Sequence, residues 1–369
     1  MKDFYSFDEY SIPFEIKALF WGLYLLVFVY AAKKMLLSSN GNRRNSDITS
    51  LFFIYFVLFA IFYCVNPDYF RYREWIYGRD FDLWNKEESY IYIILFCRSL
   101  PFSYPFEVFR MIVWGGAILI AYQTFRWYRT QLLPSQTLLL LFVLHAGTIS
   151  YARASLAMAV YFLGVALYLL HEGKFLKILG VVMAVSSFYF HREMMIGVAA
   201  LPCLFIPFDR KNFSFFSIFL LIAAVGAISF FSINIEYLDS MFDNDDITEK
   251  IEDFNEKGQG AFRLSTLINY LRFFYPFYIV TLCLWKKKAN MCVVGMYRVT
   301  CGILMASIAF MIIFGLRSVY SYRVLYISMI PLTLLTSYCY CQGYLKKQQL
   351  AIILLLALLS NSIRFINAQ

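Results

Sequence analysis

The sequence predicts an all-α, polytopic integral membrane protein with about twelve transmembrane helices. Its 369 residues are 61% hydrophobic and only 15% charged, whereas a soluble domain is about half apolar and about a quarter charged. Long apolar runs alternate with short basic connections. Each spanning helix needs about 20 mainly apolar residues, because backbone N–H and C=O groups in hydrocarbon must pair within the helix. We therefore expect a single membrane-embedded domain over residues 1–369.

Apolar runs between charged breaks define the predicted spans. They cover 18–36, 49–66, 106–125, 134–150, 153–170, 175–190, 194–207, 213–232, 266–285, 297–315, 323–341 and 348–364. A further run at 90–100 is too short to span, and Arg98 interrupts it. We expect an interfacial or re-entrant helix there.

Lysine marks one side of the predicted bundle. Short cytoplasmic loops collect Lys and Arg, and the connections that contain Lys33, Lys174, Lys286 and Lys346 all fall on the same side. This assignment places both termini outside. The net charge of +9 then reports topology, and no nucleic-acid partner is expected.

Two predicted outer loops are longer than the others. The loop at 67–105 contains the short helix, and the loop at 233–265 is acidic. Asp243, Asp245 and Asp246 in the second loop lack the glycine and the terminal glutamate of a calcium-binding EF-hand. The cysteines form no C-x-x-C pair. We expect neither a metal site nor a cofactor.

Arginines gather on the predicted outer side, against the usual topological bias. They are Arg71, Arg73, Arg79, Arg153, Arg192, Arg263, Arg317 and Arg323. Guanidinium binds phosphate oxygens through paired N–H donors and stays charged at any working pH. We therefore predict a diphosphate ligand, with Arg153, Arg192, Arg317 and Arg323 as its binding residues. The alternative is that such arginines only reach lipid phosphates from helix ends.

Candidate proton acceptors lie on the same predicted side. Arg153 opens one predicted span, and His191 and Glu193 close the next, so the intervening stretch crosses once in each direction. Histidine and carboxylates are the usual general acids and bases. The candidates are His191, Glu193, Asp68 and Glu88, although these carboxylates could instead only neutralise neighbouring arginines.

Three further residues are candidates for substrate binding. Arg71 and Tyr72 lie in the first outer loop, and Tyr326 follows Arg323 by three residues, on the same helical face. Aromatic faces stack on sugars. The alternative is that the tyrosines belong to the aromatic belt of the membrane interface.

Several short motifs resemble the EpsG-type and Wzy-like polysaccharide polymerases. The central block of that family is similar to Arg153-Ala-Ser-Leu-Ala157, Glu172-Gly-Lys-Phe175 and Phe190-His191. Its first outer loop and its late Arg-Tyr corner are similar to Pro67-Asp-Tyr-Phe-Arg-Tyr72, Glu87-Glu-Ser-Tyr90 and Tyr322-Arg-Val-Leu-Tyr326. Two positions differ, because Ala154 stands where the family usually has Gln and Arg192 stands where a small residue is common.

The resemblance implies a GT-C-like helical bundle in the bacterial inner membrane, with its active site facing the periplasm or exterior. The implied activity is metal-independent glycosyl transfer that joins undecaprenyl-diphosphate-linked oligosaccharide repeat units into O-antigen, capsular or exopolysaccharide chains. A chain-length regulator and a flippase of the same pathway are the implied protein partners.

Three alternative functions stay open from the sequence. A polysaccharide ligase uses the same lipid-linked donor. A flippase or transporter for lipid-linked oligosaccharides also needs many spans, although transporters usually place polar groups near the midplane. A membrane acyltransferase would also use Arg and His.

Overall fold

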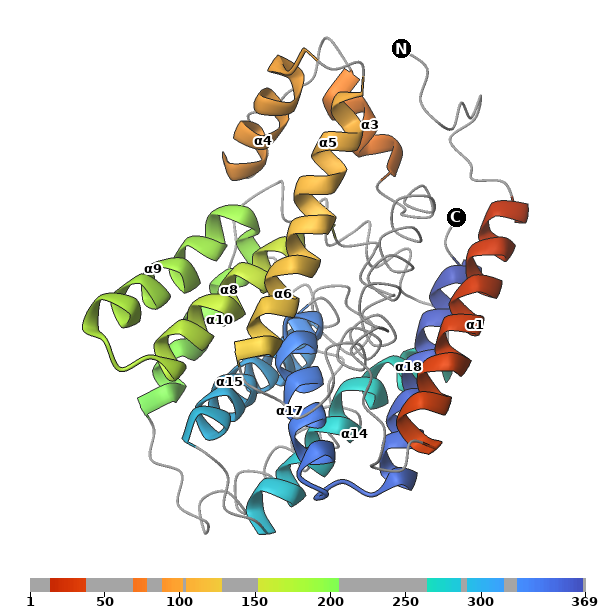
Figure 1. The fold of residues 1–369 in the computed structure, drawn as a ribbon, viewed down its shortest axis with the longest axis vertical. Coiled ribbons are helices and arrows are strands. Elements are labelled where there is room, and N and C mark those ends of the chain that lie inside the picture. The colour runs from red at the N-terminus through yellow and green to blue at the C-terminus, as the bar shows by residue number, and fades with distance from the viewer. Residues whose placement is uncertain are drawn as a thin grey trace.

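The structure, a computed structural model, describes residues 14–37, 69–77, 88–101, 104–127, 152–205, 264–286, 291–314 and 324–367. Every regular element in these ranges is helical (Figure 1). The elements are α1 (Phe14–Leu37), α3 (Tyr69–Tyr77), α4 (Glu88–Ser99), α5 (Pro105–Arg110), η2 (Met111–Gly115), α6 (Gly116–Trp127), α8 (Ala152–Leu170), α9 (Lys174–Phe190), η4 (Arg192–Met194), α10 (Met195–Ala200), η5 (Leu201–Phe205), α14 (Leu264–Lys286), α15 (Met291–Phe314), α17 (Met329–Cys341) and α18 (Lys347–Asn367).

The predicted all-α membrane bundle is confirmed. Three helices in the described ranges are long and apolar enough to cross a membrane, at Arg153–Leu170, Leu267–Trp285 and Met291–Ala309. The short helix predicted at 90–100 is α4. The predicted spans at 49–66, 134–150 and 213–232 lie outside the described residues, so the count of twelve stays a prediction.

The segment predicted to span at 194–207 differs from expectation. Its α-helix, α10, runs only from Met195 to Ala200, and the 3-10 turn η5 follows at Leu201–Phe205. Pro202 is the physical reason. Proline has no N–H to continue the α-helical hydrogen bonds, so Pro202 cannot donate to the carbonyl four residues before it.

The helix predicted at 323–341 is interrupted as well. A turn at Ser328 separates a helical turn at 324–327 from α17. The hydroxyl of Ser328 donates to the Leu325 carbonyl at 2.6 Å, and Pro331 cannot donate an N–H to the preceding turn. After α17, Gly343 adopts a φ of 68°, a left-handed conformation that suits glycine at a helix C-terminus.

The helices α8 and α9 form a tightly packed antiparallel hairpin (Figure 1). A Cβ built on Gly164 would lie 2.5 Å from the Gly180 carbonyl oxygen, and a Cβ on Gly180 would lie 2.6 Å from the Gly164 oxygen. Such distances are too short for any side chain. The two glycines therefore allow the helix backbones to touch, as small residues commonly do between membrane helices.

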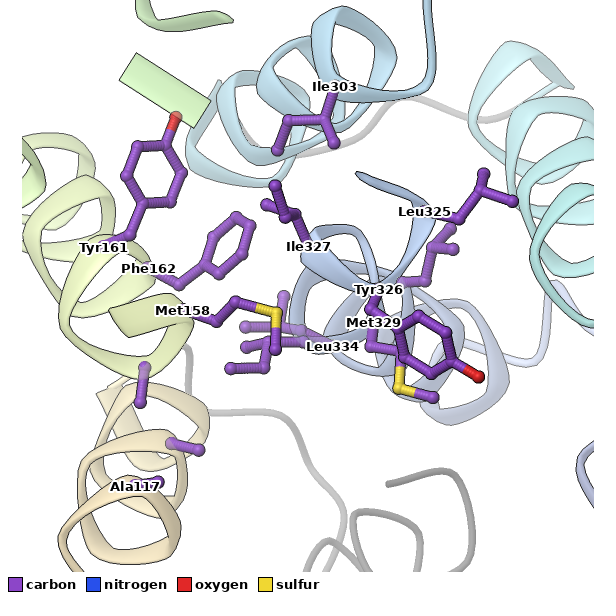
Figure 2. Close-up of a cluster of buried hydrophobic side chains, with 14 of the residues drawn as sticks. Ala117, Met158, Tyr161, Phe162, Ile303, Leu325, Tyr326, Ile327, Met329 and Leu334 are labelled. Carbon is purple, nitrogen blue, oxygen red and sulfur yellow. The ribbon is translucent and has the colours of Figure 1, made fainter. Parts of the chain in front are cut away.

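Helix α8 of the hairpin lies in the hydrophobic core, whereas one face of α9 is exposed. Helix α8 contacts α6, α15 and α17. Figure 2 shows Met158 and Phe162 of α8 pointing toward Ile327 and Leu334. Tyr161, one turn from Met158, donates its hydroxyl to the Gly197 carbonyl of α10. This bond fixes the short helix that follows the hairpin against α8.

A buried polar network joins α1, α14 and α18. Arg272 of α14 is only 5% exposed, and its Nη1 donates to Asn361 Oδ1 at 2.7 Å and to Ser360 Oγ at 3.1 Å. Asn361 in turn donates from Nδ2 to the Tyr24 hydroxyl of α1 at 2.9 Å. Buried polar groups are costly unless they are hydrogen-bonded. The network therefore favours one packing position of α1 against α18 (Figure 1).

We predict that Gly164→Ala or Gly180→Ala destabilises the protein by about 2 kcal/mol, because the added methyl group forces the hairpin apart. The measurement is thermal unfolding of the purified protein in detergent. Gly22→Ala in α1 is the matched control, since its Cβ would meet nothing within 4 Å, and it should leave the unfolding temperature unchanged or raise it. Equal unfolding temperatures for all three variants would contradict the close backbone contact.

Candidate functional site

Arg153 lies at the start of α8 and contacts α3, in the segment predicted to form the first outer loop. Its guanidinium carbon is 5.2 Å from the centroid of the Trp75 ring in α3. Tryptophan is the strongest cation–π partner among the aromatic residues. The contact brings together two segments that the sequence separates widely and that were both predicted to lie outside.

The side chain of Arg98 in α4 binds the backbone carbonyl of the same tryptophan. Its Nε donates to the Trp75 carbonyl oxygen at 3.0 Å, and its Nη2 donates to the same oxygen. Trp75 lies in the last turn of α3, where carbonyl groups have no partner within the helix. A cation there also interacts favourably with the helix dipole. Arg98 therefore caps α3 and ties it to α4.

Aromatic side chains pack around Trp75. Tyr72 lies edge to face against it, with ring centroids 5.0 Å apart. Tyr72 also contacts Phe109 at 5.7 Å and Trp114 at 6.0 Å. Trp75 and Tyr72 are each only 1% exposed. The cluster packs α3 onto the α5–η2 segment and restricts the position of the ring beneath Arg153.

His191 and Glu193 form a pair at the end of α9. His191 Nε2 lies 3.2 Å from Glu193 Oε2, and their side chains are 14% and 20% exposed. The helix ends here because His191 is extended, with φ −159° and ψ 121°, before the chain turns into η4. A carboxylate beside Nε2 favours the tautomer with its proton on that nitrogen, so Nδ1 is the basic nitrogen of the neutral ring.

The hairpin places this pair at the same end as Arg153. Helix α8 begins beside Arg153 and α9 ends beside His191, and η4 contacts both helices. The short helix α4 also contacts α9. The opposite end carries lysines, with Lys177 Nζ 5.9 Å from the Tyr168 ring and Lys174 exposed. Arg153 and His191 therefore lie at one end of the hairpin, and Lys174 and Lys177 lie at the other, together with His171.

Two predicted substrate-binding tyrosines are buried. Tyr72 lies in the aromatic cluster, and Tyr326 packs edge to face on Phe273 with ring centroids 5.2 Å apart. Arg192, a predicted diphosphate-binding residue, is exposed in η4 beside the His191–Glu193 pair. The roles of these three residues stay predictions.

The remaining predicted residues are placed only in part. Arg71 lies in α3 and Glu88 begins α4. The others lie outside the described residues: Asp68, Arg317 and Arg323.

Trp75 and Arg98 were not among the predicted site residues. The sequence signal for Arg98 was its position as a lone charge in a short apolar helix, since such a charge needs a partner. Trp75 carried no comparable signal.

The thiol of Cys97, next to Arg98, is poorly suited to act as a nucleophile. Its side chain is fully buried, and burial raises the pKa of its thiol to about 11. The thiol therefore stays protonated at neutral pH, whereas the thiolate is the reactive form. In the part of the chain that the structure covers, no group of three or more His, Cys, Asp or Glu residues is arranged to hold a metal ion. The expected metal independence stays a prediction.

The chain matches the model of a known protein family. The model of the EpsG family matches residues 47–368. Searches of curated proteins and of solved structures gave no match.

Proposed function

The chain belongs to the EpsG family, and we propose that it polymerises lipid-diphosphate-linked oligosaccharide repeat units into a polysaccharide. Family membership supports a general role as a polysaccharide polymerase. The long apolar helices are those of a membrane protein. The observation that carries the specific proposal is the end of the α8–α9 hairpin, where Arg153 lies with the His191–Glu193 pair.

The proposed reaction exchanges one bond to the anomeric carbon for another. A hydroxyl of the new repeat unit attacks the anomeric carbon that joins the growing chain to its lipid diphosphate. The carbon–oxygen bond to the diphosphate breaks, and the lipid diphosphate leaves with the bonding electron pair. The hydroxyl proton passes to a base on the protein.

Arg153 would stabilise the charge that develops on the leaving diphosphate. Fixed cations aimed at developing charge contribute strongly in a site that excludes water. Guanidinium groups can supply the charge that divalent ions supply in other enzymes, and we propose that no metal is needed. Arg192, Arg317 and Arg323 are the further proposed diphosphate-binding residues.

His191 would accept the proton of the attacking hydroxyl. Glu193 lies beside Nε2 and would stabilise the imidazolium that forms when Nδ1 takes the proton. Asp68 and Glu88 are the alternative proton acceptors. Arg71, Tyr72 and Tyr326 complete the proposed site as substrate-binding residues.

The setting of the reaction is also part of the proposal. The donor would be carried on undecaprenyl diphosphate in the bacterial inner membrane, with this end of the hairpin facing the periplasm or exterior. A chain-length regulator and a flippase of the same pathway are the proposed protein partners.

We predict that Arg153→Ala abolishes long chains while single repeat units persist, because the leaving diphosphate loses its counter-charge. Loss of one such stabilising group lowers turnover by about 100-fold or more. The measurement is gel analysis of surface polysaccharide in a deletion strain complemented with each variant, normalised to folded protein in the membrane. Lys174→Ala, an exposed cation at the opposite end of the hairpin, is the matched control and should give normal chains.

Normal chain lengths in folded Arg153→Ala would reject the polymerase assignment for this site. Full-length polymer that accumulates on the carrier lipid would instead assign ligation to a separate acceptor.

We predict that His191→Gln lowers the polymerisation rate by about 100-fold, the usual contribution of a general base. Glu193→Gln keeps a hydrogen-bond partner but loses the charge, and should cost about tenfold. The rate is measured with purified protein and with lipid-linked repeat units extracted from the deletion strain. A wild-type rate for His191→Gln would exclude this histidine as the base and leave Asp68 or Glu88 as candidates.

A further inference from the structure

We propose that Trp75 and Arg98 are positioning residues that hold Arg153 in place to stabilise the leaving diphosphate. This inference rests on the proposed function of Arg153. It assigns a role to two residues in the first outer segment that lie away from the α8–α9 hairpin in sequence. Neither residue needs to touch the substrate.

The contact with Trp75 can hold the Arg153 guanidinium in position without neutralising its charge. The ring attracts the guanidinium through its quadrupole, with the guanidinium carbon 5.2 Å from the centroid. An aromatic face carries no net charge, so the attraction does not neutralise the arginine. A carboxylate in the same place would neutralise it and compete with phosphate oxygens for its N–H donors.

The ring itself is fixed on two sides. Its edge-to-face contact with Tyr72 and its burial restrict its rotation. Its backbone carbonyl accepts both hydrogen bonds from Arg98. Because two donors of one rigid guanidinium meet a single oxygen, Arg98 restrains the end of α3 more firmly than a lysine would.

Helix α3 needs this restraint. It spans only Tyr69–Tyr77, and helices shorter than about 12 residues are marginal without tertiary support. Arg98 caps its last turn, and α4 and α5 pack against it. The chain of contacts therefore runs from Arg98 to the α3 carbonyl, then through the Trp75 ring to Arg153.

The turnover of Trp75 variants should depend on whether residue 75 keeps an aromatic ring, not on the volume of its side chain. The assay uses purified full-length protein with lipid-linked repeat units extracted from the deletion strain. Trp75→Phe keeps a weaker π face and should stay within about threefold of wild type, whereas Trp75→Leu should lose about tenfold or more. The turnover of Arg98→Gln should fall by a similar factor, and the turnover of Arg98→Lys should lie between those of Arg98→Gln and the wild type. The loss should appear in kcat rather than in KM, because the charge acts on the leaving group.

Phe277→Leu is the matched control. It removes a buried aromatic ring from another part of the core, where Phe277 stacks on Tyr297 with ring centroids 5.4 Å apart. Its turnover per folded protein should stay within about threefold of wild type, because this ring lies outside the aromatic cluster that holds the cation. Equal losses in Trp75→Leu and Phe277→Leu would overturn the inference, since packing alone would then explain both. If Trp75→Leu does not fold, the turnover of Arg98→Gln tests the inference instead. Arg98 is only half-buried, so its substitution disturbs folding less.

The two proposals fail differently. If Arg153→Ala is inactive while folded Trp75→Leu and Arg98→Gln turn over as wild type does, the positioning role is wrong and the proposed function stands. If Arg153→Ala is fully active, the proposed function is wrong and the positioning role falls with it.

Discussion

The contact between Gly164 and Gly180 is the constraint on which the arrangement of the site depends. It allows the backbones of α8 and α9 to touch, and so the end of α9 returns beside the start of α8. Arg153 and the His191–Glu193 pair then belong to one rigid unit, and their relative position does not depend on a long loop. Catalytic groups placed on packed helices are held more accurately than groups placed on mobile connections.

The same structure separates two uses of arginine. Arg272 is buried within α14 and donates to the neutral side chains of Ser360 and Asn361. These bonds join helices. Arg153 lies instead at a helix start, over an aromatic ring. The first arrangement engages the arginine in hydrogen bonds between helices, whereas the second places it at the end of a helix against an aromatic face.

Hydrophobic length predicted most of the described helices, because the bilayer requires long apolar runs whose limits are visible in the sequence. The interruptions at Pro202 and Ser328 followed from local chemistry that the apolar pattern conceals. The site was less predictable. The hairpin length predicted that Arg153, His191 and Glu193 return to one end, whereas their roles stay predictions. The contacts of Trp75 with Arg98 and Arg153 depend on tertiary packing between distant segments, which no local pattern records. The same limit applies to Tyr72 and Tyr326, because no local pattern records that their side chains are buried.

The account requires the end of the hairpin that carries Arg153 and His191 to face the exterior. Single cysteines at the exposed positions Arg192 and Glu172, at opposite ends of the hairpin, test this directly with a membrane-impermeant maleimide on intact cells. The account predicts that Arg192→Cys is labelled in intact cells and that Glu172→Cys is labelled only after the membrane is permeabilised, each measured against the parent protein. Labelling of Glu172→Cys alone in intact cells would place the proposed site in the cytosol and contradict the account.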